Sequence, residues 1–339
     1  MGDLRERGPT SLVVTRTPLR ISFAGGGTDL PVFYERHEGT VYSTTIDRYV
    51  YVTVKRHGEV FDERIRLNYS TSESVHEIDA IRNNIAREAL RLLDIDPPIY
   101  VSVVSDLPDS SGLGGSSSFA VGLLNALHIF RGERASPRQL AEEASFLEIE
   151  VLREPIGKQD QYAAAFGGLN LLRFCRDGRV SVEQEDASRS AIDQLFAHVL
   201  MLWTGHQRRS SSVLTEQRER TAEHIDELSR LSEYAYVAQR SLANGSFDPV
   251  DFGRMLDETW RLKRSLASTV TNPAIDAWYD AAMRAGAEGG KLCGAGGGGF
   301  LLFIADPRRH QAIIEAVGDL TPIHVGYEST GSSVLLPTA

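Results

Sequence analysis

Apolar and polar residues recur along the chain with two different periods, which predicts a mixture of strands and helices. Runs of β-branched and aromatic residues indicate strands, and apolar residues three and four positions apart indicate helices. Strands are expected over residues 12–22, 50–54, 99–105, 168–174, 179–183, 198–203 and 300–304, with two more near the C-terminus. Helices are expected over residues 83–93, 119–130, 137–153, 211–243, 249–267, 273–285 and 307–317. Neither half alternates regularly between strand and helix, so the pattern favours an α+β fold over a doubly wound parallel sheet.

Two of these helices differ in how much of their surface is apolar. Residues 119–130 are apolar almost all round, which predicts a helix buried on every side. Residues 137–153 carry a single apolar stripe, and Glu148 falls at its edge on a helical wheel. Glu148 is therefore a candidate for a partly buried carboxylate, although most glutamates on helices are solvated.

Length, charge and cysteine content narrow the class of protein. At about 150 residues per domain, the chain suggests two domains, and the polar stretch 183–190 divides it into 1–188 and 189–339. The net charge of −10 repels nucleic acid and anionic membranes, so neither is an expected partner. With two distant cysteines, no export segment and no apolar run of membrane-spanning length, a cytoplasmic protein is expected. These features leave the oligomeric state open.

The sharpest local feature is a loop rich in glycine and serine between an expected strand and the expected buried helix. Glycines let the backbone approach a ligand closely, and the start of a helix adds free N–H donors and a partial positive charge. Hydroxyl groups at that position can donate to phosphate oxygens or ligate Mg²⁺. The pattern predicts a polyphosphate-binding loop, the alternative being a turn with a serine N-cap. The loop consists of Pro108, Asp109, Ser110, Ser111, Gly112, Leu113, Gly114, Gly115, Ser116, Ser117 and Ser118.

Two other nucleotide-binding motifs do not fit this chain. The loop lacks the lysine of a P-loop, and the Gly-Lys pair that ends residues 286–291 has the wrong spacing and is followed by Leu292. Residues 112–114 begin like a dinucleotide fingerprint, but Ser117 stands where its third glycine belongs. A dinucleotide-dependent oxidoreductase is therefore a disfavoured alternative.

Two shorter segments bring charged residues close to glycines. Residues 16–31 join Arg20, three consecutive glycines and Asp29 in one strand-to-loop unit, which alone is also typical of a surface arginine and a turn aspartate. Another segment places Lys158 and Asp160 ahead of an apolar run. Taken alone, Asp160 is better explained as the N-cap of a helix than as a catalytic group.

Two segments of the second half carry weaker signals. Residues 294–299 contain five glycines, and their entropy cost indicates backbone that passes very close to another group, a flexible hairpin loop being the alternative. Residues 206–212 form a cationic cluster at a strand-to-helix junction. Arg208 in this cluster, and also Lys158, are candidates to hold a substrate phosphate. Helix capping with solvated arginines explains the cluster equally well.

Taken in this order, the segments resemble the GHMP-type small-molecule kinases, the superfamily of galactokinase, homoserine kinase, mevalonate kinase and phosphomevalonate kinase. The resemblance rests on Pro18–Pro31, Pro108–Ser118 and Lys291–Gly299, which correspond to the family's three signature regions and together span nearly the whole chain. Within the superfamily the chain is most similar to the sugar-1-kinase branch, in particular the D-glycero-D-manno-heptose 7-phosphate kinases. That closer similarity is carried by residues 24–31, 45–50, 157–162 and 204–208.

The resemblance implies a fold and a set of roles. The fold has an N-terminal ATP-binding domain like the second domain of ribosomal protein S5, a ferredoxin-like C-terminal domain, and the site in the cleft between them. Residues 112–118 are expected to wrap the phosphates of ATP, and Ser116 and Glu148 to ligate Mg²⁺. Asp160 matches the family's catalytic aspartate and Arg20 its catalytic arginine.

The same resemblance suggests how the acceptor is held. Asp29 matches an aspartate that binds sugar hydroxyls. Galactokinases carry Glu-His where this chain has Gly26 and Gly27, which makes galactose a doubtful substrate and leaves room for a bulkier or phosphorylated sugar. The residues expected to contact the substrate are Gly26, Gly27, Thr28, Asp29, Lys158, Arg208, Gly296 and Gly297.

The expected activity is ATP-dependent phosphorylation of a sugar at its anomeric hydroxyl. The resemblance favours D-glycero-D-manno-heptose 7-phosphate as the acceptor, with the 1,7-bisphosphate as product. An unphosphorylated sugar such as fucose or another hexose is an alternative acceptor. A sensor that binds sugar and ATP without turnover is a second alternative, which the presence of Asp160 and of the serine triplet 116–118 disfavours.

Overall fold

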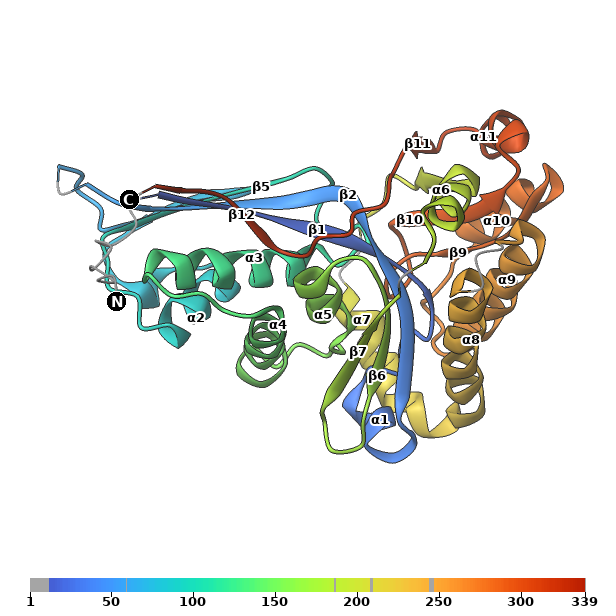
Figure 1. Ribbon diagram of the computed structural model, residues 1–339, viewed down its shortest axis with the longest axis horizontal. Helices are drawn as coiled ribbons and strands as arrows, with labels where there is room; N and C mark the ends of the chain where they lie inside the picture. The colour runs from blue at the N-terminus through green and yellow to red at the C-terminus, as the bar shows by residue number, and fades with distance from the viewer. Residues whose placement is uncertain (1–11, 59, 186, 208–209, 244–246, 339) are drawn as a thin grey trace, which may run out of the picture.

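The computed structural model of the protein describes residues 12–58, 60–185, 187–207, 210–243 and 247–338. These residues form two β-sheets with helices packed against them. The larger sheet and its helices make a long arm on the left of Figure 1, and the smaller sheet lies among the helices on the right.

The larger sheet has eight strands in the order β12-β1-β2-β5-β3-β4, with β6 and β7 joined through β2. They are β1 (Leu12–Ala24), β2 (Gly39–Arg56), β3 (Ile65–Asn68), β4 (Ser72–Val75), β5 (Ile99–Ser105), β6 (Leu169–Phe174), β7 (Val180–Gln184) and β12 (Ser333–Thr338). Strand β2 bends through the molecule, because its first part pairs with β6 and its last part with β5 (Figure 1). Only its last part was expected from the sequence, since the first part is rich in buried threonine and serine rather than in aliphatic residues.

One face of this sheet is covered by helices α2 (Asn84–Leu92), α3 (Gly115–Phe130), α4 (Pro137–Ser145) and α5 (Gln159–Phe166). Helix α3 packs directly on β1 and β2, and the other three helices pack around it. Every apolar residue of α3 except Ile129 is buried. The expectation of a helix buried on every side is therefore confirmed.

The helix expected over 137–153 changes its winding half-way. Helix α4 continues directly into a π-helical turn over Phe146–Val151. The wider π turn rotates the residues around the axis, so Phe146 and Val151 point to solvent while Glu148 is only 1% exposed. Glu148 is thus more deeply buried than its place on an ideal helical wheel suggested.

The smaller sheet is antiparallel, with the order β11-β8-β10-β9. Its strands are β8 (Val199–Trp203), β9 (Ala287–Leu292), β10 (Phe300–Ala305) and β11 (Thr321–Ile323). Numbered along the chain, the four strands lie across the sheet in the order 4-1-3-2. Helices connect the first strand to the second and the third to the fourth, which is the ferredoxin-like arrangement. Strand β9 was not expected, because its sequence Ala-Glu-Gly-Gly-Lys-Leu has no β-branched residue; its glycines let the neighbouring helix approach closely.

Six longer helices surround or connect the strands of this part. They are α6 (Arg189–His198), α7 (Ser210–Arg220), α8 (Ile225–Ala243), α9 (Pro249–Ser265), α10 (Pro273–Arg284) and α11 (His310–Val317). The single helix expected over 211–243 is divided into α7 and α8 by a short 3₁₀ turn at Thr221–Glu223. Helix α6 was not expected.

The two sheets share one apolar core, so the parts are packed against each other rather than loosely linked. Phe23 of β1 meets Phe252 of α9 edge to face, with ring centroids 5.3 Å apart. Phe33 of the short helix α1 (Pro31–His37) lies in a separate buried cluster with Leu228 and Leu231 of α8. These contacts fix the second part against the β1 segment that carries Arg20.

The end of the chain returns to the larger sheet. Strand β12 pairs antiparallel with β1, from Leu12 opposite Thr338 to Arg16 opposite Ser333. A division into 1–188 and 189–339 would assign β12 to the second part. We therefore propose that the C-terminal domain begins near residue 189 and ends before β12.

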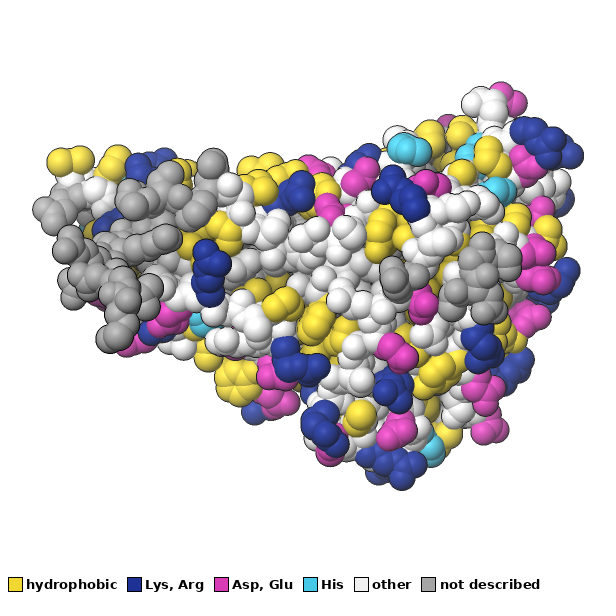
Figure 2. All heavy atoms as spheres, in the orientation of Figure 1, with side chains coloured by type: hydrophobic (Ala, Val, Ile, Leu, Met, Phe, Trp, Pro, Cys, Tyr) yellow, Lys and Arg dark blue, Asp and Glu magenta, His cyan; other side chains and the backbone are white. Residues whose placement is uncertain are grey.

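The surface carries charges of both signs. On the face drawn in Figure 2, Lys and Arg side chains are interspersed with Asp and Glu rather than gathered in one region. Among the described helices, none has both the length and the apolar character needed to traverse a lipid bilayer.

Candidate active site

A cavity of about 700 Å³ lies where the segments singled out in the sequence meet. Its walls come from residues more than two hundred positions apart, contributed by both parts of the molecule. They include Arg20, Ser22, Gly26, Gly27, Asp29, Ser110–Gly112, Gly114–Ser117, Glu148, Gln159, Asp160, Gln217, Lys263, Lys291, Cys293–Gly296 and Gly298. The structure thus brings together the arginine, the three carboxylates and both glycine loops.

The two glycine-rich loops touch backbone to backbone at one end of this cavity. A Cβ on Gly294 would lie 2.4 Å from the Cα of Gly112, and a Cβ on Gly112 would lie 2.6 Å from the carbonyl oxygen of Cys293. Real Cβ atoms do not approach other atoms so closely, and both glycines have positive φ, which other residues rarely adopt. The close approach that the glycine content predicted is therefore made to the other glycine loop.

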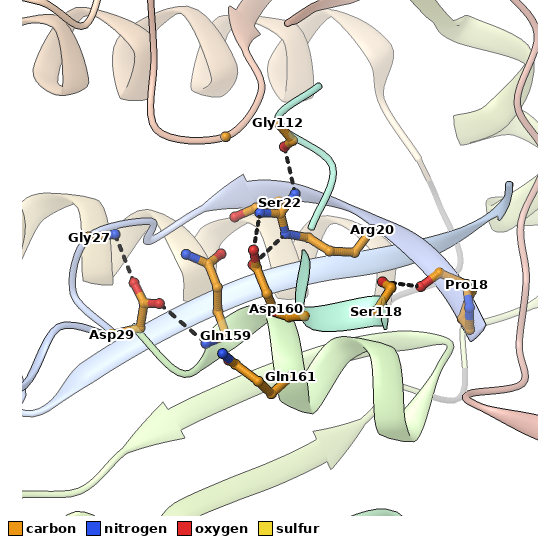
Figure 3. A network of polar contacts seen from close by, with 12 residues as sticks. Pro18, Arg20, Ser22, Gly27, Asp29, Gly112, Ser118, Gln159, Asp160 and Gln161 are labelled. Carbon is orange, nitrogen blue, oxygen red and sulfur yellow. Dashed lines mark hydrogen bonds and ion pairs between the residues drawn. The ribbon is translucent and has the colours of Figure 1, made fainter. Parts of the chain in front are cut away.

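Arg20 and Asp160 form a two-pronged ion pair inside the cavity (Figure 3). Arg20 Nε donates to Asp160 Oδ1 at 2.7 Å and Nη2 to Oδ2 at 2.8 Å, while Nη1 donates to the carbonyl of Gly112 at 2.7 Å. Such a pairing fixes the plane of the carboxylate as well as its position. Asp160 makes no capping hydrogen bond, because Lys158 occupies the N-cap of α5. The N-cap explanation for Asp160 is therefore wrong.

Asp29 is buried beside this pair and is held by the backbone. Its carboxylate accepts hydrogen bonds from the N–H of Gly27 at 3.0 Å and of Gln159 at 3.2 Å (Figure 3). Burial raises the pKa of Asp29, and the nearby negative charge of Asp160 raises it further. The cavity therefore has a second carboxylate, whose backbone contacts fix its position beside Asp160.

Glu148 is surrounded by three hydrogen-bond donors. Ser116 Oγ, Ser117 Oγ and Gln161 Nε2 each donate to its carboxylate at 2.7 Å. Burial raises the pKa of Glu148 to about 7, against the opposing effect of these donors. A buried carboxylate next to a serine hydroxyl is an oxygen pair of the kind that Mg²⁺ prefers, and a cation there would offset the burial of the charge.

The described residues contain no group of three or more His, Cys, Asp or Glu side chains that would hold a metal ion. A site built from Ser116 and Glu148 therefore depends on further oxygen ligands from a phosphate or from water. Mg²⁺ keeps several waters and commonly combines one carboxylate with phosphate oxygens. The donor set fits that ion better than it fits Zn²⁺, which prefers nitrogen and sulfur ligands.

The serine triplet divides between two roles. Ser116 and Ser117 face Glu148, whereas Ser118 Oγ donates to the carbonyl of Pro18 at 2.9 Å and ties the start of α3 to β1 (Figure 3). Leu113 is fully buried, and its carbonyl accepts from the N–H of Arg20 at 3.0 Å. Pro108 is exposed ahead of the loop and does not line the cavity.

Of the residues expected to contact the substrate, Gly26, Gly27, Asp29 and Gly296 line the cavity. Thr28 is fully buried and instead closes the turn through hydrogen bonds to Gly25 and Thr40. The N–H of Gly297 is bonded to the carbonyl of Val270 at 2.8 Å, outside the lining.

Of the two candidate phosphate contacts, Lys158 does not line this cavity. Lys158 lines a separate groove with Tyr162 and Cys175, where its Nζ donates to the carbonyl of Gly178 at 3.0 Å and lies 5.4 Å from the centre of the Tyr34 ring. Arg208 lies outside the described residues.

The cavity residues that the sequence reasoning missed include three buried polar side chains. Lys263 on α9 and Lys291 at the end of β9 are buried cations, and Gln217 on α7 is a buried amide. A Cβ on Gly27 would lie 2.1 Å from Gln217 Nε2, so α7 closes directly over the Gly27 turn. Lys291 opens the second glycine loop, which was a usable signal. Nothing local marks Lys263 or Gln217, because Lys263 lies on an ordinary amphipathic helix and Gln217 on a helix that is polar along most of its length.

Comparison with known families connects this geometry to an activity. Residues 80–168 match the N-terminal domain of the GHMP kinases, and residues 239–321 match their C-terminal domain. The chain belongs to the GHMP kinase family. Together the matches span just over half of the chain and include the loop at 112–118, Glu148 and Asp160. The protein is therefore an ATP-dependent phosphotransferase with an alcohol group as acceptor.

Relatives within the family extend over nearly the whole chain. The D-glycero-alpha-D-manno-heptose 7-phosphate kinase of Campylobacter jejuni is 28% identical over 319 residues, which cover 89% of this chain and 92% of that protein. The L-fucokinase/L-fucose-1-P guanylyltransferase of Bacteroides fragilis is also 28% identical, over 92% of this chain but 36% of its own length.

Solved structures share the fold. A D-glycero-D-manno-heptose 1-phosphate kinase from Bacteroides thetaiotaomicron superimposes with a TM-score of 0.79 and 25% identity, covering 96% of this chain and all of that one. The galactokinase of Lactococcus lactis, solved with galactose, superimposes with a TM-score of 0.74 at 17% identity, over 98% and 96% of the two chains. The expected α+β fold, with GHMP kinase N- and C-terminal domains, is confirmed.

Proposed function

We propose that the protein is a sugar kinase of the GHMP family that phosphorylates the anomeric hydroxyl of D-glycero-D-manno-heptose 7-phosphate. The observation that carries the proposal is the Arg20–Asp160 pair, held in a cavity that also contains the phosphate-binding loop and the buried carboxylate of Asp29. The similarity to heptose phosphate kinases along most of the chain supports this acceptor.

Asp160 is placed to accept the proton of the attacking hydroxyl. In the transfer, the sugar oxygen forms a bond to the γ-phosphorus of ATP, the bond from that phosphorus to the β-phosphate bridging oxygen breaks, and the hydroxyl proton passes to Asp160. An anomeric hydroxyl is more acidic than other alcohols, so a carboxylate is a sufficient base. Arg20 holds the carboxylate plane and supplies positive charge next to the transferred group.

The loop at 112–117 and Glu148 form the wall proposed for the triphosphate. Backbone N–H groups at the start of α3 and the partial positive charge of that helix favour phosphate oxygens. Ser116 and Glu148 would hold Mg²⁺, which neutralises phosphate charge when it is bound. The hydrogen bond between these two side chains, at 2.7 Å, keeps both oxygens in place in the meantime.

A different part of the cavity lining is the proposed sugar wall. Asp29 offers a fixed acceptor for sugar hydroxyls, and Gly26 and Gly27 present backbone without a side chain. The Gln217 side chain closes over Gly27, so the space for a bulky or phosphorylated sugar lies at Gly26, where the nearest side-chain atoms are 3.9 Å from an added Cβ. The second candidate acceptor is an unphosphorylated sugar such as fucose, which the similarity to the L-fucokinase favours.

A substrate panel tests the proposal. ATP consumption is measured with free hexoses, fucose, free heptose and heptose 7-phosphate, and phosphorus NMR locates the new ester. We expect turnover to be fastest with heptose 7-phosphate and the new ester to be at the anomeric carbon. Faster turnover of fucose would identify fucose as the acceptor in place of heptose 7-phosphate. An ester at any other carbon would refute anomeric transfer.

A further inference from the structure

Two buried ammonium groups face the cavity without a carboxylate partner. Lys263 and Lys291 are 8% and 5% exposed, and both line the cavity. Among the described residues, no carboxylate oxygen lies within 4.0 Å of either Nζ atom. Arg20 in the same cavity differs, since its guanidinium is matched by both oxygens of Asp160.

The two lysines do not use all of their N–H donors in hydrogen bonds to the protein. An ammonium group has three N–H donors. Lys291 Nζ donates to the carbonyls of Ser22 at 2.8 Å and Phe23 at 3.1 Å, and Lys263 Nζ donates to the carbonyl of Gly294. Within the described part of the chain, one donor of Lys291 and two of Lys263 thus remain for something in the cavity.

Buried charge without a directly bonded counter-charge is costly in a protein. Burial lowers the pKa of Lys263 to about 8 and that of Lys291 to about 7, and repulsion by Arg20 lowers both further, while Asp29 and Asp160 offset part of the effect at Lys263. A buried cation is retained where it is paired, because an unpaired one loses its hydration without compensation. An anion between the two lysines would supply that compensation and restore their ordinary basicity.

The choice of lysine at these positions stands out against the composition. The chain has 32 arginines and 4 lysines, and two of those four lysines face this one cavity. Arginine pairs in two-pronged fashion with carboxylate or phosphate, whereas lysine is a compact point charge that also binds phosphate. The residue type is therefore compatible with a phosphate ligand.

We propose that Lys263 and Lys291 together form a binding subsite for a dianionic phosphoryl group. The inference rests on the proposed function, which offers two sources for the bound phosphoryl group. One is the phosphate that the acceptor sugar already carries, and the other is the phosphoryl group in transfer. In both cases the lysines donate their free N–H groups to non-bridging phosphate oxygens. The subsite is built from α9 and the end of β9, so its positive charge comes from elements other than those that carry Ser116 and Glu148.

A binding experiment tests the subsite without any turnover. Inorganic phosphate is titrated into the protein in the presence of ADP by calorimetry, for the wild type, Lys263→Met and Lys291→Met. Lys55→Met serves as the matched control, because Lys55 is exposed on β2 far from the cavity. We expect at least a tenfold loss of phosphate affinity in the two cavity variants and none in the control. Equal affinity in all four proteins would overturn the proposal.

A labelling experiment covers the case in which a variant does not fold. The wild-type protein is treated with an amine-acylating reagent, and the four lysines are quantified by mass spectrometry with and without inorganic phosphate. We expect phosphate to protect Lys263 and Lys291 and to leave Lys55 unchanged. Equal labelling of Lys263 and Lys291 in both conditions would refute the subsite.

Kinetics with two acceptors then distinguish the two sources. If the subsite holds the acceptor's own phosphate, Lys291→Met raises KM for the phosphorylated sugar at least tenfold and leaves KM for a free sugar unchanged. If it holds the group in transfer, kcat falls by a similar factor with both acceptors. Unchanged kinetics with both acceptors would overturn the inference. A wild type inactive with every sugar would refute the proposed function, while the phosphate titration would still decide on the subsite.

Discussion

The two walls of the cavity treat charge in opposite ways. On the wall built from β1, the first glycine loop, α5 and the π-helical turn, two charged groups bond to other side chains: Arg20 to Asp160, and Glu148 to two serines and a glutamine. On the wall built from α9 and β9, Lys263 and Lys291 meet only backbone carbonyls. The first wall is preorganised by hydrogen bonds between its side chains, whereas the ammonium groups of the second have N–H donors left for a ligand.

The largest effect is expected at Asp160, on the wall that carries the Arg20–Asp160 pair. Asp160→Asn keeps the shape of the side chain but removes the proton acceptor and leaves Arg20 without an opposite charge. We expect kcat to fall by at least about a hundredfold, the size typical of lost acid–base catalysis. Steady-state kinetics measures this, with circular dichroism to show that the fold is intact. Near-normal turnover would remove Asp160 from the mechanism.

A substitution where the two walls meet is expected to reduce stability. Gly294→Ala would place a Cβ 2.4 Å from Gly112, in addition to the strain of φ +71°. Gly132→Ala is the matched control, since Gly132 has φ +84° but nothing within 4 Å of the added atom. We expect a loss of about 3 kcal/mol for Gly294→Ala and about 1 kcal/mol for Gly132→Ala in urea unfolding. Equal losses would mean that the contact between the loops is not tight.

Two serines of the triplet 116–118 are expected to have different roles, Ser116 in Mg²⁺ binding and Ser118 in stabilising the fold. Ser116→Ala removes an oxygen proposed for Mg²⁺, so the Mg²⁺ concentration for half-maximal activity should rise at least about tenfold. Ser118→Ala leaves the buried carbonyl of Pro18 without its donor, so stability should fall by about 1 kcal/mol with the Mg²⁺ requirement unchanged. Titration of activity with Mg²⁺ and thermal unfolding distinguish the two variants. An equal Mg²⁺ shift in both would contradict the division of roles.

A smaller effect is expected at a histidine that is paired with glutamates away from the cavity. His128 is buried at the end of α3, and its ring nitrogens lie 2.7 Å from Glu143 and 3.2 Å from Glu133. The hydrogen bond to Glu143 raises the pKa of His128, and the pKa of Glu143 is lowered in return. The pairing therefore stabilises the fold fully below the unfolded histidine pKa of 6.5 and is lost as the pH rises through the raised value.

Comparison of the wild type with His128→Gln isolates this contribution. The difference in free energy of unfolding should be largest near pH 5–6 and shrink toward pH 9; below the ordinary glutamate pKa of 4.5 it should fall again as Glu143 is protonated. Urea unfolding at a series of pH values measures it. A difference that does not vary with pH would mean that His128 acts through packing alone.

Much of this architecture was predictable from the chain. The strand at 99–105, the helix at 119–130 and the two glycine loops follow from local residue patterns, because period and glycine content act over a few neighbouring residues. The first part of β2 and the whole of β9 were missed, since their burial and pairing come from distant segments rather than from β-branched residues. The same holds for Lys263 and Gln217, because nothing in the residues around them on α9 and α7 indicates that they face a site.

The sequence by itself determined which segments carry groups able to bind a ligand or take part in catalysis. They are Arg20 with its glycine turn, the glycine-serine loop, Glu148, Asp160 and the second glycine loop. Only the tertiary structure decided how those segments divide the work. Contacts such as Ser118 with Pro18, or Gly294 with Gly112, join residues a hundred or more positions apart, and no local pattern encodes them. Ion pairing likewise depends on which side chains are neighbours in the folded chain. Only the tertiary structure therefore shows that, among the residues it describes, Lys263 and Lys291 have no carboxylate bonded to them.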